Sequence, residues 1–210
     1  MTGSDAGPLT KRQQQAVQTR ERMLRAAREV FETRGYQAAS VAAITKAADT
    51  AHGTFYLYFR NRDDAFAQVI AEAVDEILDE SRARLAPGRY EGLEGVIRGV
   101  LVVLTRHAGL WRALLEGTML SPEIEQIWLA ATGEFTARIA RRLEREQAAG
   151  DVRPVDAAEV AEALSSMTQW YAFRKLTRHG VEATEADLDQ AVHTVADLWF
   201  HAIYGVTERD

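Results

Sequence analysis

Apolar residues recur at intervals of three and four along most of this chain, and this spacing constrains the fold more than any other feature. From residue 63 onward, the spacing predicts helices over 63–85, 90–106, 110–119, 122–149, 157–178 and 185–204. Gly or Pro stands in or beside the intervals between these segments, as expected where helices begin and end. The sequence lacks the strict alternation of half-buried strands, so the predicted fold is all-α, with about nine helices.

The N-terminal part of the chain predicts a smaller unit of three helices. The first helix should stop at Gly35, because glycine readily adopts the left-handed backbone that ends helices. Ser40 is a suitable N-cap for a short second helix over 41–48. A further short helix follows a break at 49–51 and continues through Tyr58. Two short helices joined by a three-residue turn match the helix-turn-helix motif.

The charge distribution supports this division. The chain has 25 Lys and Arg against 31 Asp and Glu, a net charge of −6, but residues 1–62 hold ten of the basic and five of the acidic side chains. That part therefore carries +5, and the remainder carries −11. Such asymmetry indicates a basic head that meets a polyanion, with chance fluctuation as the alternative. We expect a flexible tail over 1–14, a helix-turn-helix domain over 15–62 and a larger helical domain over 63–210.

Composition narrows the class of protein. There is no cysteine, which excludes disulfides, thiolate catalysis and cysteine-ligated zinc. The N-terminal residues lack the apolar segment of a secretory signal, and the longest apolar run is too short to cross a bilayer. We therefore expect a soluble, cytoplasmic protein with no membrane partner and no cofactor.

The second short helix of the motif carries the candidate DNA-reading residues. In a helix-turn-helix, the N-terminal residues of this helix meet base edges in the major groove. His52 can donate to a guanine or phosphate acceptor, and Thr54 can offer its hydroxyl to phosphate or its methyl group to thymine. Gly53 is unfavourable in a helix but lacks bulk, so the backbone can lie close to DNA.

The aromatic side chains that follow are sorted by helical phase. Phe55 and Phe59 are four residues apart and should pack inward on one face. Tyr56 and Tyr58 fall outside that face, so their hydroxyls are candidates for phosphate contact, with ordinary partly buried packing as the alternative. Basic and small residues beside the motif are candidates for backbone contacts. The complete predicted DNA-contacting set is Ser40, Val41, His52, Gly53, Thr54, Tyr56, Tyr58, Arg60 and Arg62.

These residues carry a resemblance to a known family. The segment 19–73 resembles the DNA-binding domain of TetR-family bacterial transcriptional repressors, through GTFYLYF at 53–59 followed by the basic RNR at 60–62. Two positions depart from the family pattern. Asp49 replaces the usual turn glycine and is compatible with left-handed backbone, and Thr50 replaces an apolar turn residue. The resemblance implies a double-stranded DNA operator as partner.

More weakly, the C-terminal half resembles repressors related to the mycobacterial repressor of the ethionamide-activating monooxygenase. The resemblance lies in IW at 127–128, the stretch 138–150, LW at 198–199 and AIYG at 202–205. It implies an elongated apolar ligand held in a channel of the helical body. It also implies a homodimer in which the last two helices of each chain form a four-helix bundle.

The sequence supports the dimer and the ligand site independently. The last two predicted helices carry apolar side chains on more than one face, which indicates contact with both the chain's own core and a second chain. A two-fold dimer predicts a near-palindromic operator. Large side chains on the inner helices are candidates for a ligand cavity, with simple core packing as the alternative. The candidates are Trp111, Met119, Trp128, Phe135, Met167, Thr168, Trp170, Tyr171 and Phe173.

Two other readings of the body remain open from the sequence alone. Asp189, His193, Asp197 and His201 recur every four residues, a spacing that suits a metal site or a solvated polar face. We favour the polar face and predict no metal. A ligand-responsive DNA-binding repressor is therefore the leading hypothesis. The alternatives are an all-α enzyme, for which the sequence offers no evident nucleophile–base pair, and a small-molecule carrier with a non-functional helix-turn-helix.

Overall fold

A computed structural model describes residues 10–177 and 182–205, and this part of the chain contains nine helices and no strand. The all-α prediction is therefore confirmed. The helices are α1 (Lys11–Ala38), α2 (Val41–Ala47), α3 (His52–Phe55), α4 (Arg62–Ala83), α5 (Arg89–Arg106), α6 (Ala108–Leu120), α7 (Pro122–Ala148), α8 (Ala157–Leu176) and α9 (Glu185–Tyr204).

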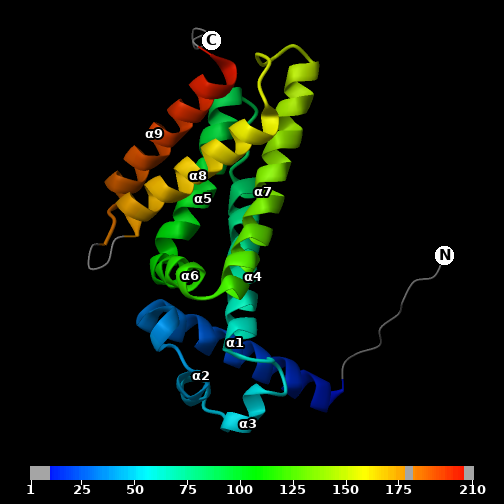
Figure 1. Ribbon diagram of the computed structural model, residues 1–210, viewed down its shortest axis with the longest axis vertical. Coiled ribbons are helices and arrows are strands. Elements are labelled where there is room, and N and C mark those ends of the chain that lie inside the picture. Colours follow the sequence, from blue (N-terminus) through cyan, green and yellow to red (C-terminus); the bar gives the residue numbers. More distant parts are fainter. Residues whose placement is uncertain (1–9, 178–181, 206–210) are drawn as a thin grey trace, which may run out of the picture.

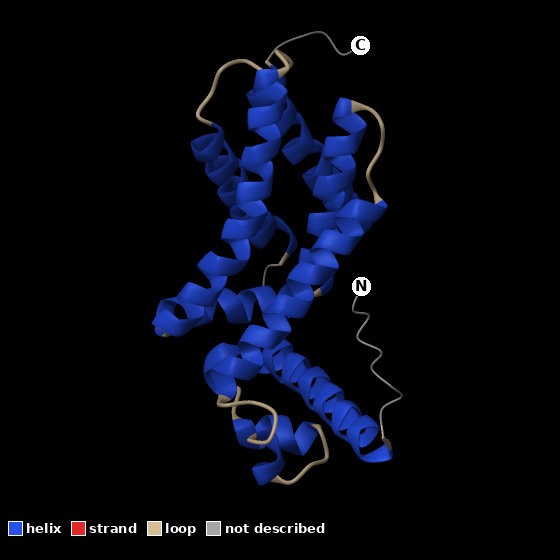
Figure 2. Ribbon diagram, turned by 90° about the vertical axis from the view of Figure 1, so that its right-hand side faces the viewer, coloured by secondary structure: helices blue, strands red, loops and turns tan. Residues whose placement is uncertain are grey.

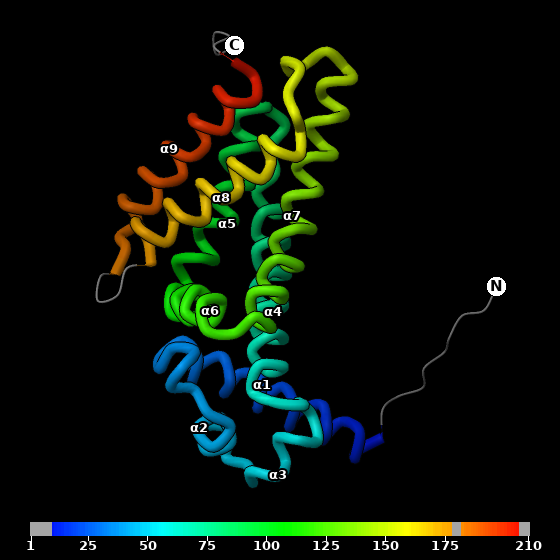
Figure 3. Tube along the Cα trace, viewed as in Figure 1, coloured from blue at the N-terminus to red at the C-terminus, as the bar shows by residue number. Residues whose placement is uncertain are grey.

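The helices form two units that α4 connects. Helices α1, α2 and α3 make a small unit at one end of the molecule, and α4 runs from this unit into a body of long helices (Figure 1). The view turned by 90° shows the same division (Figure 2). Helix α6 lies between the body and α1, and it packs along α1 (Figure 3). The body is thus joined to the small unit through two helices, α4 and α6.

Helix α1 begins earlier than expected and is broken where expected. Thr10 caps it, because its hydroxyl accepts from the Gln13 backbone N–H while the Gln13 side chain accepts from the Thr10 backbone N–H. Helical structure therefore starts at Lys11, so the predicted tail over 1–14 was drawn four residues too long, and 1–9 lie outside the described residues. Gly35 has φ +76°, which interrupts the helical backbone before Tyr36.

The turn of the helix-turn-helix follows its sequence closely. The Ser40 hydroxyl caps α2 by accepting from the Ala43 backbone N–H at 3.2 Å. Asp49 takes a left-handed backbone with φ +50°, as its place in the motif predicts. Helix α3 is shorter than expected and ends at Phe55 instead of Tyr58. The reason is local, because the N–H groups of 57 and 58 bond carbonyls three residues earlier, in a tighter turn.

One continuous core runs through both units. In the small unit, Phe31, Phe55, Phe59 and Phe66 are fully buried, and the Phe31 and Phe66 rings lie 4.3 Å apart. Burying a phenylalanine side chain contributes about 1.5–3 kcal/mol. These side chains come from α1, α3, the turn after α3 and α4. The core therefore fixes α3 on a foundation made by the two longer helices.

Candidate DNA-binding surface and ligand cavity

Helix α3 presents a small exposed surface above this core. His52 and Gly53 are exposed, Thr54 is half-buried, and Tyr56 is 55% exposed. Beneath them, Phe55 is fully buried and lies 5.1 Å from Phe59 between ring centroids. The predicted inward and outward faces are therefore separated in the structure. Within the described residues, the side chains of His52 and Tyr56 are open to a partner.

Gly53 is not required by the packing of the described protein. A Cβ atom built at this position meets no heavy atom within 4 Å. Alanine is a better helix former than glycine by about 1 kcal/mol. The absence of a side chain at Gly53 therefore has no explanation inside the folded chain, whereas the close approach of DNA supplies one.

The remaining residues of the predicted DNA-contacting set divide into two groups. Ser40 and Arg60 are exposed, and Arg60 pairs with Asp64 at 3.3 Å. Val41 and Tyr58 are half-buried and pack against the core. All four lie beside α3, at the edge of the same small unit, and the two exposed side chains face outward.

Arg62 has a different position from the one its sequence context suggests. Its guanidinium donates to the carbonyl oxygens of Tyr36 and Ala39, each at 3.2 Å, and to Asp63 at 3.1 Å. It also lies 4.2 Å from the centre of the Tyr36 ring. These contacts hold α4 to the end of α1. Arg62 therefore has a structural role, and its phosphate contact stays a prediction.

Helix α6 also contacts the break in α1, through Glu116. The Glu116 carboxylate accepts from the backbone N–H of Tyr36 at 2.9 Å and from that of Gln37 at 3.2 Å. A Cβ at Gly35 would lie 2.7 Å from Glu116 Oε2, so the left-handed glycine also makes room for this contact. Glu116 thus ties the body to the segment that leads into α2.

A charged cluster joins the two units at a second place. His107 Nδ1 lies 2.8 Å from Glu32 on α1, and Nε2 lies 2.9 Å from Glu76 on α4. The Glu32 hydrogen bond raises the pKa of His107, with a smaller contribution from Glu76, and together they outweigh partial burial and nearby Arg28. Burial acts to raise the pKa of Glu76, but hydrogen bonds from Arg106 and His107 lower it overall.

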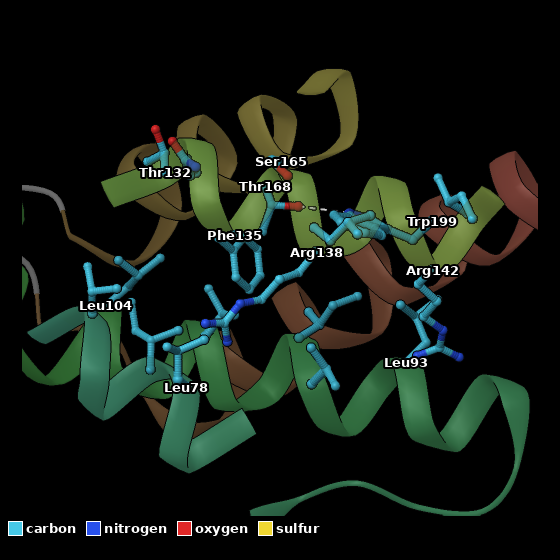
Figure 4. Close-up of a pocket in the computed structure, with 18 of the residues that line it drawn as sticks. Leu78, Leu93, Leu104, Thr132, Phe135, Arg138, Arg142, Ser165, Thr168 and Trp199 are labelled. Atoms are coloured by element: carbon cyan, nitrogen blue, oxygen red, sulfur yellow. Dashed lines mark hydrogen bonds between the residues drawn. The ribbon is translucent and has the colours of Figure 1, made fainter. Parts of the chain in front are cut away.

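The body contains a cavity of about 260 Å³. Helices α4, α5, α7, α8 and α9 supply most of its wall, and α6 adds Trp111. Figure 4 shows side chains from α7 and α8 facing aliphatic side chains of α4 and α5 across this space. The wall is mainly apolar, and its aliphatic part includes Val74, Ile77, Leu78, Leu93, Val96, Ile97, Val100 and Leu104 of α4 and α5. The polar and charged side chains in the wall are Thr132, Arg138, Arg142, Glu146, Ser165, Thr168, Gln169 and Tyr204.

The predicted ligand-binding residues fall into three places. Trp111, Trp128, Phe135 and Thr168 line this cavity. A smaller cavity of about 160 Å³, which shares Trp111 and Trp128 with the first, is lined by Trp170 and Phe173. The other three candidates line neither cavity: Met119 is 86% exposed, and Met167 and Tyr171 are half-buried against the core.

Comparison with known proteins places the chain in a family. Residues 23–69 match the family model described as bacterial regulatory proteins, tetR family. Residues 93–205, more than half of the chain, match the model for the C-terminal domain of the transcriptional regulator EthR. The chain belongs to the TetR family. It is therefore a DNA-binding transcriptional regulator, and the regulators to which it is similar are not enzymes.

Individual relatives of this TetR-family regulator agree. The HTH-type transcriptional regulator UidR of Escherichia coli (strain K12) is 29% identical over 164 residues, which cover 74% of this chain and 81% of that protein. The HTH-type transcriptional repressor AcnR of Corynebacterium jeikeium is 26% identical over 80% of this chain and 86% of its own length.

Solved structures support the fold. A TetR-family regulator from Syntrophomonas wolfei has a TM-score of 0.76 at 15% identity, covering 92% of this chain and 99% of that one. The fatty acid degradation regulator FadR of Bacillus halodurans has a TM-score of 0.71 at 22% identity, covering 91% and 97%. At these identities the similarity concerns the fold alone.

The polar row on α9 of the TetR-family chain has structural partners. Asp189 pairs with Arg98 on α5 at 2.7 Å, and the Tyr90 hydroxyl donates to Asp197 at 2.9 Å and lies 3.1 Å from His193. His201 Nδ1 lies 2.8 Å from the Asp197 carbonyl oxygen. The contacts of Asp189, His193 and Asp197 join α9 to α5, whereas that of His201 lies within α9. Within the described residues, no three His, Cys, Asp or Glu side chains are grouped so as to hold a metal ion.

Several cavity residues are not among the candidates that the sequence predicts. Arg138, Arg142 and Ser165 line the cavity, as do aliphatic side chains of α4 and α5. A signal was present for the arginines, because positions 135, 138 and 142 share one face of α7 with this spacing. Among the described residues, the buried side-chain polar atoms without a hydrogen-bond partner are Trp111 Nε1 and Ser165 Oγ, and both residues line this cavity.

Two further observations concern the outside of the molecule. Trp170 on α8 is 57% exposed and stacks on Phe173 with centroids 5.3 Å apart, and Leu198 on α9 is also exposed. Helices α8 and α9 therefore present apolar side chains outward. In the described part of the chain, no helix is long and apolar enough to cross a membrane.

Proposed function

We propose that this chain is a homodimeric repressor that leaves a near-palindromic operator when an apolar small molecule binds in the 260 Å³ cavity. The observation that carries the DNA-binding part is the exposed surface of α3. His52, Gly53 and Tyr56 lie open on that surface, while Phe55 and Phe59 anchor the helix from below. Family members bind DNA operators and typically act as homodimers with small-molecule effectors.

The proposed DNA contacts follow the positions of the side chains. His52 and Thr54 meet base edges, and Gly53 lets the backbone of α3 approach the groove. Tyr56 and Arg60 bind backbone phosphates, because hydroxyl and guanidinium donors at the edge of the motif reach phosphate oxygens. Ser40, Val41 and Tyr58 support the same edge.

The proposed dimer uses α8 and α9. Their outward apolar side chains, Trp170 and Leu198 among them, are suited to burial against the same helices of a second chain. Such a contact is self-complementary and two-fold symmetric. It would place two copies of α3 about 34–36 Å apart, or a multiple of that distance, so the two half-sites of the operator should be related by the same symmetry.

The proposed release acts through the helices that join the body to the small unit. Helix α4 contributes Val74, Ile77 and Leu78 to the cavity and continues to the helix-turn-helix. Helix α6 contributes Trp111 to the cavity and Glu116 to the break in α1. A ligand that binds better when α4 and α6 are displaced shifts the dimer away from the DNA-bound arrangement.

A gel-shift titration on DNA flanking the chain's own gene tests the DNA-binding proposal. We expect a salt-sensitive, sequence-selective complex with the wild-type chain, because phosphate contacts release counterions. The double variant Thr54→Ala/Tyr56→Phe should lose this complex. Gln126→Ala, on the exposed side of α7, is the matched control and should retain it. Equal binding of all DNA sequences by the wild type would refute operator recognition.

A further inference from the structure

The hydrogen-bonding groups in the cavity wall are unbalanced toward donors. Its strongest acceptor is already occupied, because Glu146 accepts from Arg142 at 2.8 Å and from the Tyr204 hydroxyl at 2.8 Å. The Thr168 hydroxyl accepts from Trp199 Nε1 at 2.8 Å and donates to the Leu164 carbonyl oxygen. The other side-chain acceptors of the wall are neutral oxygens, such as those of Thr132 and Gln169, so Glu146 is the one carboxylate among the described lining residues.

Donors, in contrast, remain available. Trp111 Nε1 has no partner, and the Ser165 hydroxyl, on a side chain 4% exposed, is also unpartnered. An arginine carries five N–H donors. Arg138 uses Nη2 for Glu134, at 2.5 Å, and Arg142 uses Nε for Glu146 and also contacts the Tyr204 hydroxyl, so each retains further N–H donors. An entering molecule thus meets indole and guanidinium N–H groups, which require an acceptor.

The two arginines lie at one side of the cavity, each paired with a glutamate one turn away on α7, Glu134 or Glu146. In Figure 4, Arg138 and Arg142 extend from α7 toward α4 and α5, near Leu78 and Leu93. Their side chains are 42% and 47% exposed, so the guanidinium groups lie at an opening and remain partly hydrated. An anion bound there avoids the full desolvation that a deeply buried charge requires.

We propose that the molecule bound in this cavity is a medium-chain carboxylate. Its head binds Arg138 and Arg142, and its alkyl chain lies along α7 toward Trp128. Planar guanidinium donors match a carboxylate in geometry and charge, and the aliphatic wall of α4 and α5 covers the chain. This inference rests on the proposed function only in taking the cavity as a ligand site.

The spacing of Trp128 and Arg138 along α7 gives an approximate length for the alkyl chain. Ten residues of α7 separate Trp128 from Arg138, which corresponds to about 15 Å at about 1.5 Å per residue. An extended alkyl chain with bonds of about 1.5 Å advances roughly 1.3 Å per carbon, so about ten to twelve carbons span this distance. The volume of about 260 Å³ lies just below the usual range for ligand sites, about 300–1,000 Å³, which favours a slender molecule.

The test compares three ten-carbon probes that differ in the head group: decanoate, 1-decanol and decylamine. Binding to the purified full-length chain is measured by calorimetry, and by the fluorescence of Trp111, Trp128 and Trp199, which line the cavity. We expect decanoate to bind at least tenfold more tightly than decanol, and decylamine to bind most weakly. Arg138→Gln should weaken decanoate about tenfold and leave decanol unchanged.

Arg141→Gln is the matched control, because Arg141 lies on the exposed side of α7 outside the cavity wall. Equal affinity for decanoate and decanol, or no effect of Arg138→Gln, would overturn the carboxylate inference while the cavity remained a ligand site. Failure of all three probes to bind would overturn it as well.

A gel shift with decanoate separates this inference from the proposed function. Suppose that decanoate binds more tightly than decanol and decylamine, as expected, yet leaves the operator complex intact at saturation. That result would refute ligand-driven release but would leave the inference that the cavity binds a carboxylate.

Discussion

The substitution Gly53→Ala separates what the protein requires at α3 from what DNA requires. A Cβ at this position meets no heavy atom within 4 Å, so the variant should fold without strain. Alanine is favoured over glycine in helices by about 0.8–1.0 kcal/mol, and in so short a helix we expect a gain of about 0.5–1 kcal/mol. For a chain of this size, 1 kcal/mol corresponds to about 2–4 °C in Tm.

The same methyl group should weaken operator binding. It projects from the exposed side of α3, where the backbone is proposed to approach the groove, so DNA must move away or the methyl group must displace a contact. Loss of one good base contact corresponds to about 1–3 kcal/mol, or about five- to 150-fold in affinity. Calorimetric melting and fluorescence anisotropy on a labelled operator measure the two effects on one preparation.

Gly133→Ala is the matched control. Gly133 is a helical, exposed glycine in the middle of α7, and a Cβ there also meets no heavy atom within 4 Å. This variant should gain stability similarly and bind the operator as the wild type does. Unchanged operator affinity of Gly53→Ala would refute the close approach at α3, and a lowered Tm would contradict the open surroundings of Gly53.

Three further predictions concern the contacts between units and between chains. Because the pKa of His107 is raised in the folded protein, protonated His107 stabilises the fold fully below pH 6.5, its ordinary pKa, and this stabilisation is lost as the pH rises through the folded-state pKa. The free energy of urea unfolding of the wild type should therefore fall over this pH range, and His107→Gln should make that fall smaller. Glu116→Ala removes the acceptor of two backbone N–H groups and should cost about 1–3 kcal/mol in urea unfolding, whereas exposed Glu125→Ala should change little. Trp170→Glu should shift the chain to monomer in sedimentation velocity, whereas Leu129→Glu, on exposed α7, should not, and a dimeric Trp170→Glu would contradict the α8–α9 interface.

Much of the fold follows from local signals. Ser40 caps α2 through its own hydroxyl, Asp49 adopts the left-handed turn, and Gly35 breaks α1, all within a few residues of the features that predict them. The phase of the aromatics is also local, so Phe55 and Phe59 were correctly placed inside. The start of α1 was missed because its Thr10–Gln13 capping box lies outside the apolar pattern.

The site was less predictable where it depends on long-range packing. The sequence suggests that Arg62 is a surface cation, but its guanidinium donates to carbonyl oxygens of Tyr36 and Ala39, at the end of α1. Met119 belongs to an apolar helix, yet it lies on the side of α6 that no other described helix covers. The α4 and α5 wall of the cavity arises from pairing that no local pattern encodes. Residue size pointed to Trp111 and Trp128, whereas Arg138 and Arg142 were not predicted, although they share a face of α7 with Phe135.

The most direct test of the account is a hydroxyl-radical footprint of the wild-type chain on DNA flanking its gene. The account predicts two protected, symmetry-related half-sites spaced by about one helical turn or a multiple of it. The Thr54→Ala/Tyr56→Phe variant should leave the same DNA unprotected at equal concentration. Protection that is uniform along the DNA, or that persists in the double variant, would contradict the claim that α3 reads the operator.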